Sequence, residues 1–428
     1  MARMTSFDVA PSAARLTGSL RDIGYDFPTA IADLVDNSVA AGATRVNVEV
    51  DFHPAGSYVL VSDDGSGMTS DSLVEALRFG SRREYAKNEL GRFGLGLKTG
   101  SFSQCRRLSV VSRQAKQQRR IYTRTLDLNV IDRFDKWMVL VDESGDAINR
   151  AHSILAEGPG TVVVWEELDR VLPERYAESG WGKRRMASLA KKAAEHLSIV
   201  FHRFIQGVPG RNELVLSVNG VKLAAWDPFA TQEPHTRELP KQLFELETVG
   251  GSADVSFQGF VLPPRDQFST QDEFERMSGP LKWNRQQGLY IYRADRLVQF
   301  GGWSGLRGID EHTKLARAAI DFDTDLDEAF QINVAKMRVN LPPGLKQMLE
   351  RPVHELCVHA DDTYRKAANK SEKRGSSKSS GSSEGVALNE VGIALKSALL
   401  ETSDLKSFRR TVASIRKRHP ELSKGLGL

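Results

Sequence analysis

This chain contains few cysteines, no long apolar run and only a small excess of positive charge. Only two of its 428 residues are cysteine, so they supply neither a disulfide framework nor a clustered zinc site. No run approaches the roughly 20 apolar residues that span a bilayer. The first residues, MARMTSFDVAPSAARL, contain no apolar signal core. We therefore expect a cytoplasmic protein that does not engage a membrane.

The positive and negative charges nearly balance. The net charge is +4 and the isoelectric point is near 8.9, which suits transient contact with nucleic acid but is common in other proteins too. A hydrophobic content of 40% and a length of 428 residues allow two or three domains with real cores. Composition therefore leaves the function open.

The segment AIADLVDNSVAAGA at 30–43 has apolar residues at helical spacing and follows Pro28, a favoured first-turn residue of helices. Asp33 and Asn37 are four residues apart and so share a helix face. An amide oxygen is a hard ligand for Mg²⁺, and a carboxylate one turn away can polarise a water molecule. The solvated face of an ordinary surface helix explains the same pattern equally well.

Two glycine-rich segments follow. SDDGSGM at 62–68 comes directly after a strand-like run, so Asp63 is expected at a strand end, with Gly65 and Gly67 in a tight turn. A carboxylate only accepts hydrogen bonds and so selects a donor such as the exocyclic amine of adenine. An ordinary Asp-Gly turn is the alternative. GRFGLGLKTG at 91–100 places glycines before a helix start, where free amides bind phosphate oxygens and Lys98 adds a positive charge.

The order and spacing of the motifs resemble a known family. The matching segments are LVDNS at 34–38, DDGSGM at 63–68, GRFGLGLKTGS at 91–101 and GTVVVWEEL at 160–168. They resemble the GHKL ATPase superfamily of gyrase B subunits, MutL proteins, ninety-kilodalton heat-shock chaperones and histidine kinases. The amino-acid sequences of these segments are most similar to those of MORC proteins and their prokaryotic relatives. LYIYRADRLVQFGGWSGL at 289–306 and FQINVAKMRVNLPPGLKQML at 330–349 are similar to the transducer domain of the MutL, gyrase and MORC branches.

The resemblance implies a role for each motif residue. Asn37 would bind Mg²⁺, Asp63 would read adenine, and Asp33 with Lys336 would be catalytic, with Lys336 reaching the γ-phosphate from the transducer domain. The other implied ATP contacts are Gly65 and Gly67 beneath the base with Met68, Thr161 near the adenine, and Gly91, Gly94, Leu95, Gly96, Leu97 and Lys98 in a lid over the phosphates.

One position departs from the family pattern. The usual general base is a glutamate four residues before the asparagine, and here that position is Asp33, whose side chain is one methylene shorter. A positioned base contributes about 10²–10⁴ in rate, so we expect binding to survive and turnover to be slow. Ala40 and Ala41 also stand where an aspartate and an alanine are common in the family.

Pattern and resemblance together predict an α+β chain. We expect a Bergerat-type ATP-binding sandwich at 1–175, in which helices cover one face of a mixed sheet with strands at 45–50, 58–61, 108–112 and 161–165. A connector helix at 176–210 and a transducer-like α/β domain at 211–370 are expected to follow. SEKRGSSKSSGSSEG predicts a flexible linker at 371–385. The basic helical tail at 386–428 would be either a solvated segment or a contact for a partner protein or DNA.

The predicted function is a conformational switch driven by slow, Mg²⁺-dependent ATP hydrolysis. The resemblance implies a homodimer in the ATP state and a clamp on double-stranded DNA, acting in DNA silencing, restriction or phage defence. Two alternatives remain at this point. One is a chaperone-like ATPase that acts on polypeptides, and the other is a nucleotide-sensing regulatory subunit with little turnover.

Overall fold

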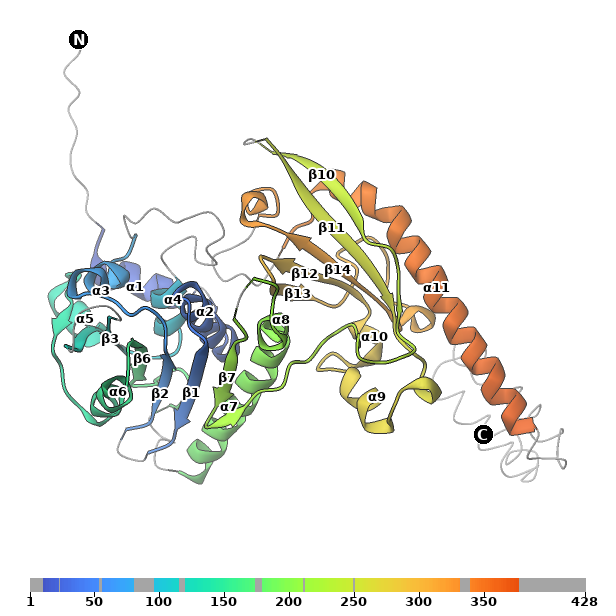
Figure 1. Cartoon of the computed structure of the whole chain (residues 1–428). Coiled ribbons are helices and arrows are strands. Elements are labelled where there is room, and N and C mark those ends of the chain that lie inside the picture. The colour runs from blue at the N-terminus through green and yellow to red at the C-terminus, as the bar shows by residue number, and fades with distance from the viewer. Residues whose placement is uncertain are drawn as a thin grey trace, which may run out of the picture. The chain divides into compact units, whose positions relative to one another are not determined.

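The computed structural model describes residues 11–22, 24–53, 56–80, 96–114, 120–173, 179–210, 212–248, 251–331 and 339–376. The chain divides into two compact units, 1–363 and 364–428, and the second is described only at the end of one long helix. No helix of the described ranges is both long and apolar enough to cross a bilayer. The architecture of the first unit is shown in Figure 1.

The first domain is built on a mixed sheet of eight strands in the order β5-β4-β3-β6-β2-β1-β7-β8. Most neighbouring strands are antiparallel, whereas β7 runs parallel to β1. The strands are β1 Arg45–Asp51, β2 Tyr58–Asp63, β3 Arg107–Arg113, β4 Tyr122–Asp127, β5 Leu140–Val141, β6 Gly160–Glu166, β7 Val215–Val218 and β8 Val221–Lys222. The predicted α+β sandwich with a mixed sheet and covering helices is confirmed.

Helices cover both faces of this sheet, whereas the sequence predicted helices on one face. Helices α2 and α7 pack on the face that carries Val59 and Trp165, while α6 packs on the opposite face against Leu60 and Val164. The central strands are buried on both faces, so a second covering layer is required. The helices are α1 Ala13–Arg21, α2 Phe27–Ala40, α3 Ser70–Leu77, α4 Gly96–Phe102, α5 Leu128–Phe134, α6 Asp146–Ala156, α7 Gly180–Val200 and α8 His202–Gln206.

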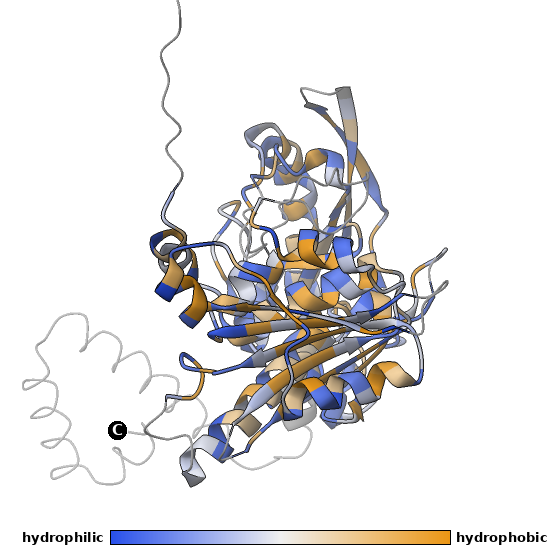
Figure 2. Ribbon diagram, turned by 90° about the vertical axis from the view of Figure 1, so that its left-hand side faces the viewer, coloured by the Kyte–Doolittle hydropathy of each residue, from blue (hydrophilic) through white to orange (hydrophobic). Residues whose placement is uncertain are grey.

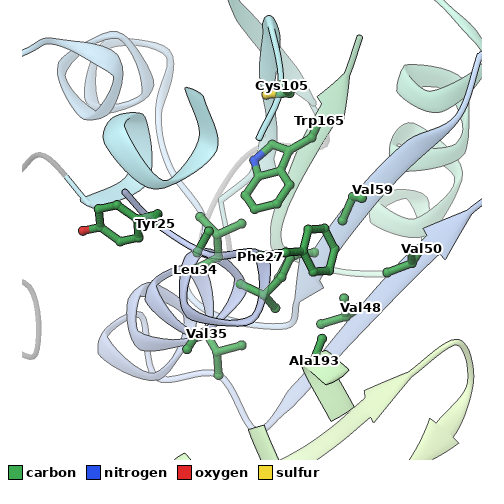
Figure 3. Close-up of a cluster of buried hydrophobic side chains, with 14 of the residues drawn as sticks. Tyr25, Phe27, Leu34, Val35, Val48, Val50, Val59, Cys105, Trp165 and Ala193 are labelled. Carbon is green, nitrogen blue, oxygen red and sulfur yellow. The ribbon is translucent and has the colours of Figure 1, made fainter. Parts of the chain in front are cut away.

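Helix α2 is buried along most of its length and begins with a defined cap. The side chain of Asp26 accepts from the backbone N–H of Thr29 at 2.9 Å, and Pro28 occupies the first turn. Figure 3 shows Phe27 of α2 reaching toward Val59 and Trp165 of the sheet, and its ring is edge-on to Trp165 at 6.0 Å between ring centroids. This packing fixes the rotation of α2, and therefore the direction in which its polar residues point.

Strands β7 and β8 follow α7 in the chain and extend the first sheet. Val215 pairs with Arg45 and Val218 with Val48, in parallel register. The sequence placed these residues within the segment 211–370, with the transducer-like domain. A parallel strand pair requires a long crossover, and α7 provides it here.

The second domain is a smaller α/β fold that contains β9 to β14 and lies within the first compact unit, 1–363. Its six-stranded sheet has the order β10-β11-β14-β12-β13, with β9 paired to β11. Helix α11 covers it with a row of buried residues that includes Leu345, Leu349 and Leu356. The elements are β9 Arg237–Glu238, β10 Gln242–Thr248, β11 Gly251–Val261, α9 Gln271–Met277, α10 Lys282–Gln286, β12 Gly288–Arg293, β13 Arg296–Phe300, β14 Ala316–Phe322 and α11 Pro343–Ser376.

The two sheets are joined by side chains of α7, α8 and the β12–β13 hairpin. His202 of α8 lies 2.8 Å from the hydroxyl of Tyr292, and Arg203 stacks on the same ring at 3.5 Å from its centroid.

Hydrophobic and hydrophilic residues alternate along the helices in Figure 2, as expected where one helix face packs on a sheet. The predicted linker and basic tail at 371–428 lie almost entirely outside the described residues.

Candidate nucleotide-binding site

Asp63, the last residue of β2, is the centre of a group of hydrogen bonds. Its Oδ1 accepts from the backbone N–H of Gly65 at 2.9 Å and of Thr161 at 3.2 Å, and its Oδ2 accepts from the Ser38 hydroxyl at 2.9 Å. A carboxylate offers about four acceptor positions, so the described residues leave one position on Oδ2 for a further donor. Burial raises the pKa of Asp63, while the bonds from Gly65, Ser38 and Thr161 lower it.

The turn after Asp63 requires glycine for steric reasons. Gly67 has a φ of +64°, and a Cβ there would lie 2.0 Å from the carbonyl oxygen of Arg113. A Cβ at Gly65 would lie 2.9 Å from the Cβ of Ala41, at the end of α2. The two glycines therefore allow the turn to lie directly against α2 and β3, as the sequence predicted for a tight turn.

Thr161 and Met68 are held to this turn through one serine. The Ser112 hydroxyl accepts from the Met68 backbone N–H at 2.9 Å and lies 3.0 Å from the Thr161 hydroxyl. Ser112 is fully buried on β3. The sequence singled out Met68 and Thr161 but not Ser112, which carries no local signal apart from its place in a strand.

Asn37 is the single exposed residue between Thr29 and Ser38 of α2. Its side chain makes no hydrogen bond to any described residue. The next residue, Ser38, donates to Asp63, so the last turns of α2 lie at the end of β2. Asn37 therefore directly precedes the residue of α2 that contacts Asp63.

Asp33 lies one turn before Asn37 and is buried, with 3% of the residue exposed. The hydroxyl of Tyr25 donates to its Oδ2 at 3.0 Å, and burial raises the pKa of this tyrosine. A Cβ at Gly96, the first residue of α4, would lie 3.2 Å from the same oxygen. The absence of a side chain at position 96 thus lets α4 begin directly beside the Asp33 carboxylate.

Lys98 points into the protein in this structure. Its Nζ donates to the carbonyl oxygens of Ala76 and Arg78 at 2.9 Å each, at the carboxyl end of α3. Burial lowers the pKa of Lys98 to about 8, while Glu75 acts to raise it. Leu97, which lies in the same helix, is half-buried against the hydrophobic core of the first domain.

Several of the predicted residues fall outside the described ranges. Gly91, Gly94 and Leu95 of the lid, and Lys336, lie in the segments 81–95 and 332–338. The structure brings together Asn37, Asp63, Gly65, Gly67, Met68 and Thr161 around the end of β2. It places Asp33, Gly96 and Lys98 at the junction of α2, α3 and α4.

The second domain also reaches α2, through Arg296 at the start of β13. Its Nε donates to Oδ1 of Asp36 at 3.0 Å, and its Nη2 lies 3.8 Å from Oδ1 of Asp33. The side chains of all three residues are at most 3% exposed. Sequence reasoning assigned no role to Asp36 or Arg296, because no local pattern connects positions 260 residues apart.

Residues 25–161 match the family model described as histidine kinase-, DNA gyrase B-, and HSP90-like ATPase. The matched segment contains α2, the turn after β2, α4 and the start of β6. This segment is a GHKL domain. The resemblance stated from the sequence is therefore confirmed for the part of the chain that holds the candidate site.

Curated relatives of the GHKL domain match over a short stretch only. Protein MICRORCHIDIA 6 of Arabidopsis thaliana is 33% identical over 94 residues, which is 21% of this chain and 14% of that protein. ATPase morc-1 of Caenorhabditis elegans is 33% identical over 86 residues, 20% of this chain and 10% of that protein. DNA mismatch repair protein MutL of Shewanella sp. (strain MR-4) is 37% identical over 93 residues, 20% of this chain and 14% of that protein.

These matches place the chain among proteins with the same type of domain. Members of the GHKL family are ATPases, and one matched relative is named as one. The match spans between 10% and 14% of the length of these relatives, so it concerns the domain and not their remaining parts.

Proposed function

We propose that this chain is a Mg²⁺-dependent ATPase that works as a nucleotide-gated switch. The main support is Asp63, which is held by Ser38, Gly65 and Thr161 with one acceptor position left over. The exocyclic amine of adenine is a donor of the kind that this position selects. Gly67 holds this turn against the end of β3, because a Cβ there would meet the Arg113 carbonyl.

Asn37 is the proposed protein ligand of the metal. Its amide is exposed on a helix that is otherwise buried over this stretch, and an amide oxygen suits a hard cation. Among the described residues, no three His, Cys, Asp or Glu side chains form a metal-binding group. The single amide oxygen of Asn37 fits Mg²⁺, which takes one or two protein oxygens together with substrate phosphates and waters. When bound, Mg²⁺ would neutralise charge on the phosphates during transfer.

Asp33 is the proposed general base. Its carboxylate would accept a proton from a water molecule while the water oxygen attacks the γ-phosphorus. The bond from the γ-phosphorus to the bridging oxygen of ADP then breaks, and ADP and phosphate are released. The hydroxyl of Tyr25 fixes Oδ2 of Asp33. The shorter reach of aspartate makes this turnover slow.

We further propose that ATP closes a homodimer, with Lys336 engaging the γ-phosphate, and that the closed form clamps double-stranded DNA in silencing, restriction or phage defence. Exposed cations of α7 support the DNA part. Lys183, Arg184 and Lys192 are exposed along α7 and form no ion pair with any described residue. By contrast, Arg106 and Arg107 are paired with acidic side chains. Exposed, unpaired cations are the ones available for phosphates.

The deciding experiment is steady-state ATP hydrolysis by the purified chain, with and without long duplex DNA. We expect slow hydrolysis that DNA accelerates, and no hydrolysis by Asn37→Ala, which controls for contaminating ATPases. A rate that Asn37→Ala leaves unchanged would reject the assignment. Nucleotide binding without turnover under both conditions would favour the regulatory subunit, and stimulation by unfolded polypeptide but not by DNA would favour the chaperone-like ATPase.

Dimer formation has its own test. Sedimentation of the chain with Mg²⁺ and a non-hydrolysable ATP analogue should show a shift from monomer to dimer. Persistent monomer at saturating analogue would count against the clamp, because a gated dimer needs a large difference in nucleotide affinity between its open and closed states.

A further inference from the structure

Two carboxylates of α2 are buried side by side. Asp33 and Asp36 are three residues apart, and 3% and 1% of their surfaces are exposed. Residues three apart on a helix are neighbours, and two like charges removed from water require a compensating cation and hydrogen bonds. The arrangement therefore depends on what reaches α2 from outside the helix.

Arg296 supplies a cation at this point. It begins β13 directly after the hairpin turn formed by Ala294 and Asp295, both of which have positive φ. Its Nε donates to Asp36 at 3.0 Å and its Nη2 stands 3.8 Å from Asp33. The guanidinium also lies 5.9 Å from the ring centroid of Phe201. The turn and the aromatic ring fix the direction of Arg296.

Neither His196 nor Tyr25, two described neighbours of this pair, supplies a second positive charge. His196 of α7 faces Arg296, Asp36 and Asp26, and its pKa is lowered to about 4 by burial first and then by Arg296. At neutral pH this imidazole is therefore uncharged. Tyr25 contacts Asp33 only as a neutral hydroxyl donor. Among the described residues, Arg296 of the second domain is the cation that contacts both carboxylates.

We propose that Arg296 is a positioning residue for Asp33. Held by Asp36, it keeps the Asp33 carboxylate in the orientation required for hydrolysis and couples the second domain to the nucleotide site. ATP can then bind the first domain without this contact, but efficient turnover requires it. The proposal rests on the ATPase function proposed above and adds to it a dependence on the β12–β13 hairpin.

The same hairpin offers a matched control. Arg293 is also buried, and it forms a two-point ion pair with Asp327 at 2.6 and 2.7 Å inside the second domain. Arg293→Gln therefore removes a buried ion pair of the same kind from the same hairpin without removing the contact of Arg296 with α2. A general loss of stability in the hairpin would affect both variants alike.

The first test is kinetic. We expect Arg296→Gln to lower kcat for ATP by about 10- to 100-fold while KM and the Kd of a non-hydrolysable analogue change by less than about threefold. Arg296→Lys should restore part of kcat, because it returns the charge but not the planar donor geometry. Arg293→Gln should keep kcat within about threefold. An unchanged kcat in Arg296→Gln, or an equal loss in Arg293→Gln, would overturn the proposal.

The second test does not require turnover. Hydrogen–deuterium exchange of the hairpin peptide 288–300 should slow in the wild-type chain when Mg²⁺ and the analogue bind, and should stay unchanged in Arg296→Gln that binds the analogue equally well. If the wild-type chain binds but does not hydrolyse ATP, the catalytic proposal fails while this measurement still decides the coupling. If binding of the analogue still slows exchange of this peptide in Arg296→Gln, the proposed coupling is rejected. Should Arg296→Gln not fold, Asp36→Asn breaks the same pair from α2 and is expected to give the same loss of protection.

Discussion

Thr161 lies directly opposite Asp63 in the paired strands β6 and β2, and its backbone N–H donates to the Asp63 carboxylate at 3.2 Å. Ser38 of α2 donates to the other oxygen of the same group. One carboxylate therefore links two strands and a helix from distant parts of the sequence. Its remaining acceptor position is defined by the fold and not by a flexible side chain.

Asp63→Asn should separate nucleotide binding from stability. The carboxamide oxygen of the variant can still accept from Gly65 and Thr161, and its NH₂ can donate to Ser38, but it presents no acceptor to adenine. We expect the Kd for ATP to rise about 10- to 100-fold, since a hydrogen bond to a charged group contributes about 1.5–3 kcal/mol. Calorimetric titration with ATP measures this effect, and an unchanged Kd would remove adenine recognition from Asp63.

The same variant should not unfold more easily at neutral pH. Because the pKa of Asp63 is raised in the folded chain, the free energy of unfolding falls as pH rises from its unfolded pKa through its folded pKa. Asparagine does not ionise, so this fall in the free energy of unfolding is absent from the variant. A marked drop in the urea midpoint of Asp63→Asn at pH 7 would show that the charge itself stabilises the fold.

Asn37→Ala should remove the effect of Mg²⁺ without changing stability. The side chain is exposed, so the free energy of unfolding should change by less than about 0.5 kcal/mol. Addition of Mg²⁺ should tighten ATP binding to the wild-type chain by roughly tenfold or more, and should have little effect on the variant. Asn149→Ala, at an exposed position on α6, is the control. Equal responses to Mg²⁺ in both variants would remove Asn37 as the ligand.

Gly67→Ala should be much more destabilising than Gly42→Ala. Both glycines have positive φ, +64° and +74°, but a Cβ at position 67 meets the Arg113 carbonyl at 2.0 Å, whereas position 42 has no atom within 4 Å. The shared backbone strain accounts for about 1 kcal/mol, and the clash should raise the loss at Gly67 to at least about 2 kcal/mol. Urea unfolding of the two variants gives the comparison. Similar losses would mean that the turn adjusts freely.

Lys98 should make stability depend on pH in the alkaline range. Its pKa is about 8 in the folded chain against an ordinary value of 10.5, so between these values the unfolded chain holds more protons and the free energy of unfolding rises with pH. Relative to Lys98→Met, the wild-type chain should gain roughly 1–2 kcal/mol between about pH 7 and 9.5. Urea unfolding across this range is the measurement. The exposed Lys183→Met should retain the wild-type slope, and an identical slope in Lys98→Met would show that Lys98 keeps its ordinary pKa.

The strands that the sequence predicted are those with simple apolar patterns. The runs at 45–50, 58–61, 108–112 and 161–165 fall within β1, β2, β3 and β6. Strand β4 was missed because its buried positions include Thr123 and Thr125, and Thr125 lies 2.8 Å from the hydroxyl of Ser109 on the neighbouring strand. A strand whose interior is satisfied by hydroxyl pairs has no apolar alternation to detect.

The site shows the same division between local and distant information. The sequence predicted Asp63 at a strand end and Gly67 in a tight turn, and the structure puts them there. The contact of Arg296 with Asp36 depends instead on how the second domain packs against α2. Periodicity and turn chemistry describe neighbours in sequence, so they contain no information about this pair.

The parallel pairing of β7 with β1 also constrains how the first domain is made. During synthesis β1 emerges early, but its partner at Val215–Val218 follows only after the whole of α7. Until then one side of β1 has unpaired backbone groups, which can pair with other chains. A fragment that ends before β7 would retain that open edge permanently, so truncations meant to isolate the candidate site should extend beyond Lys222.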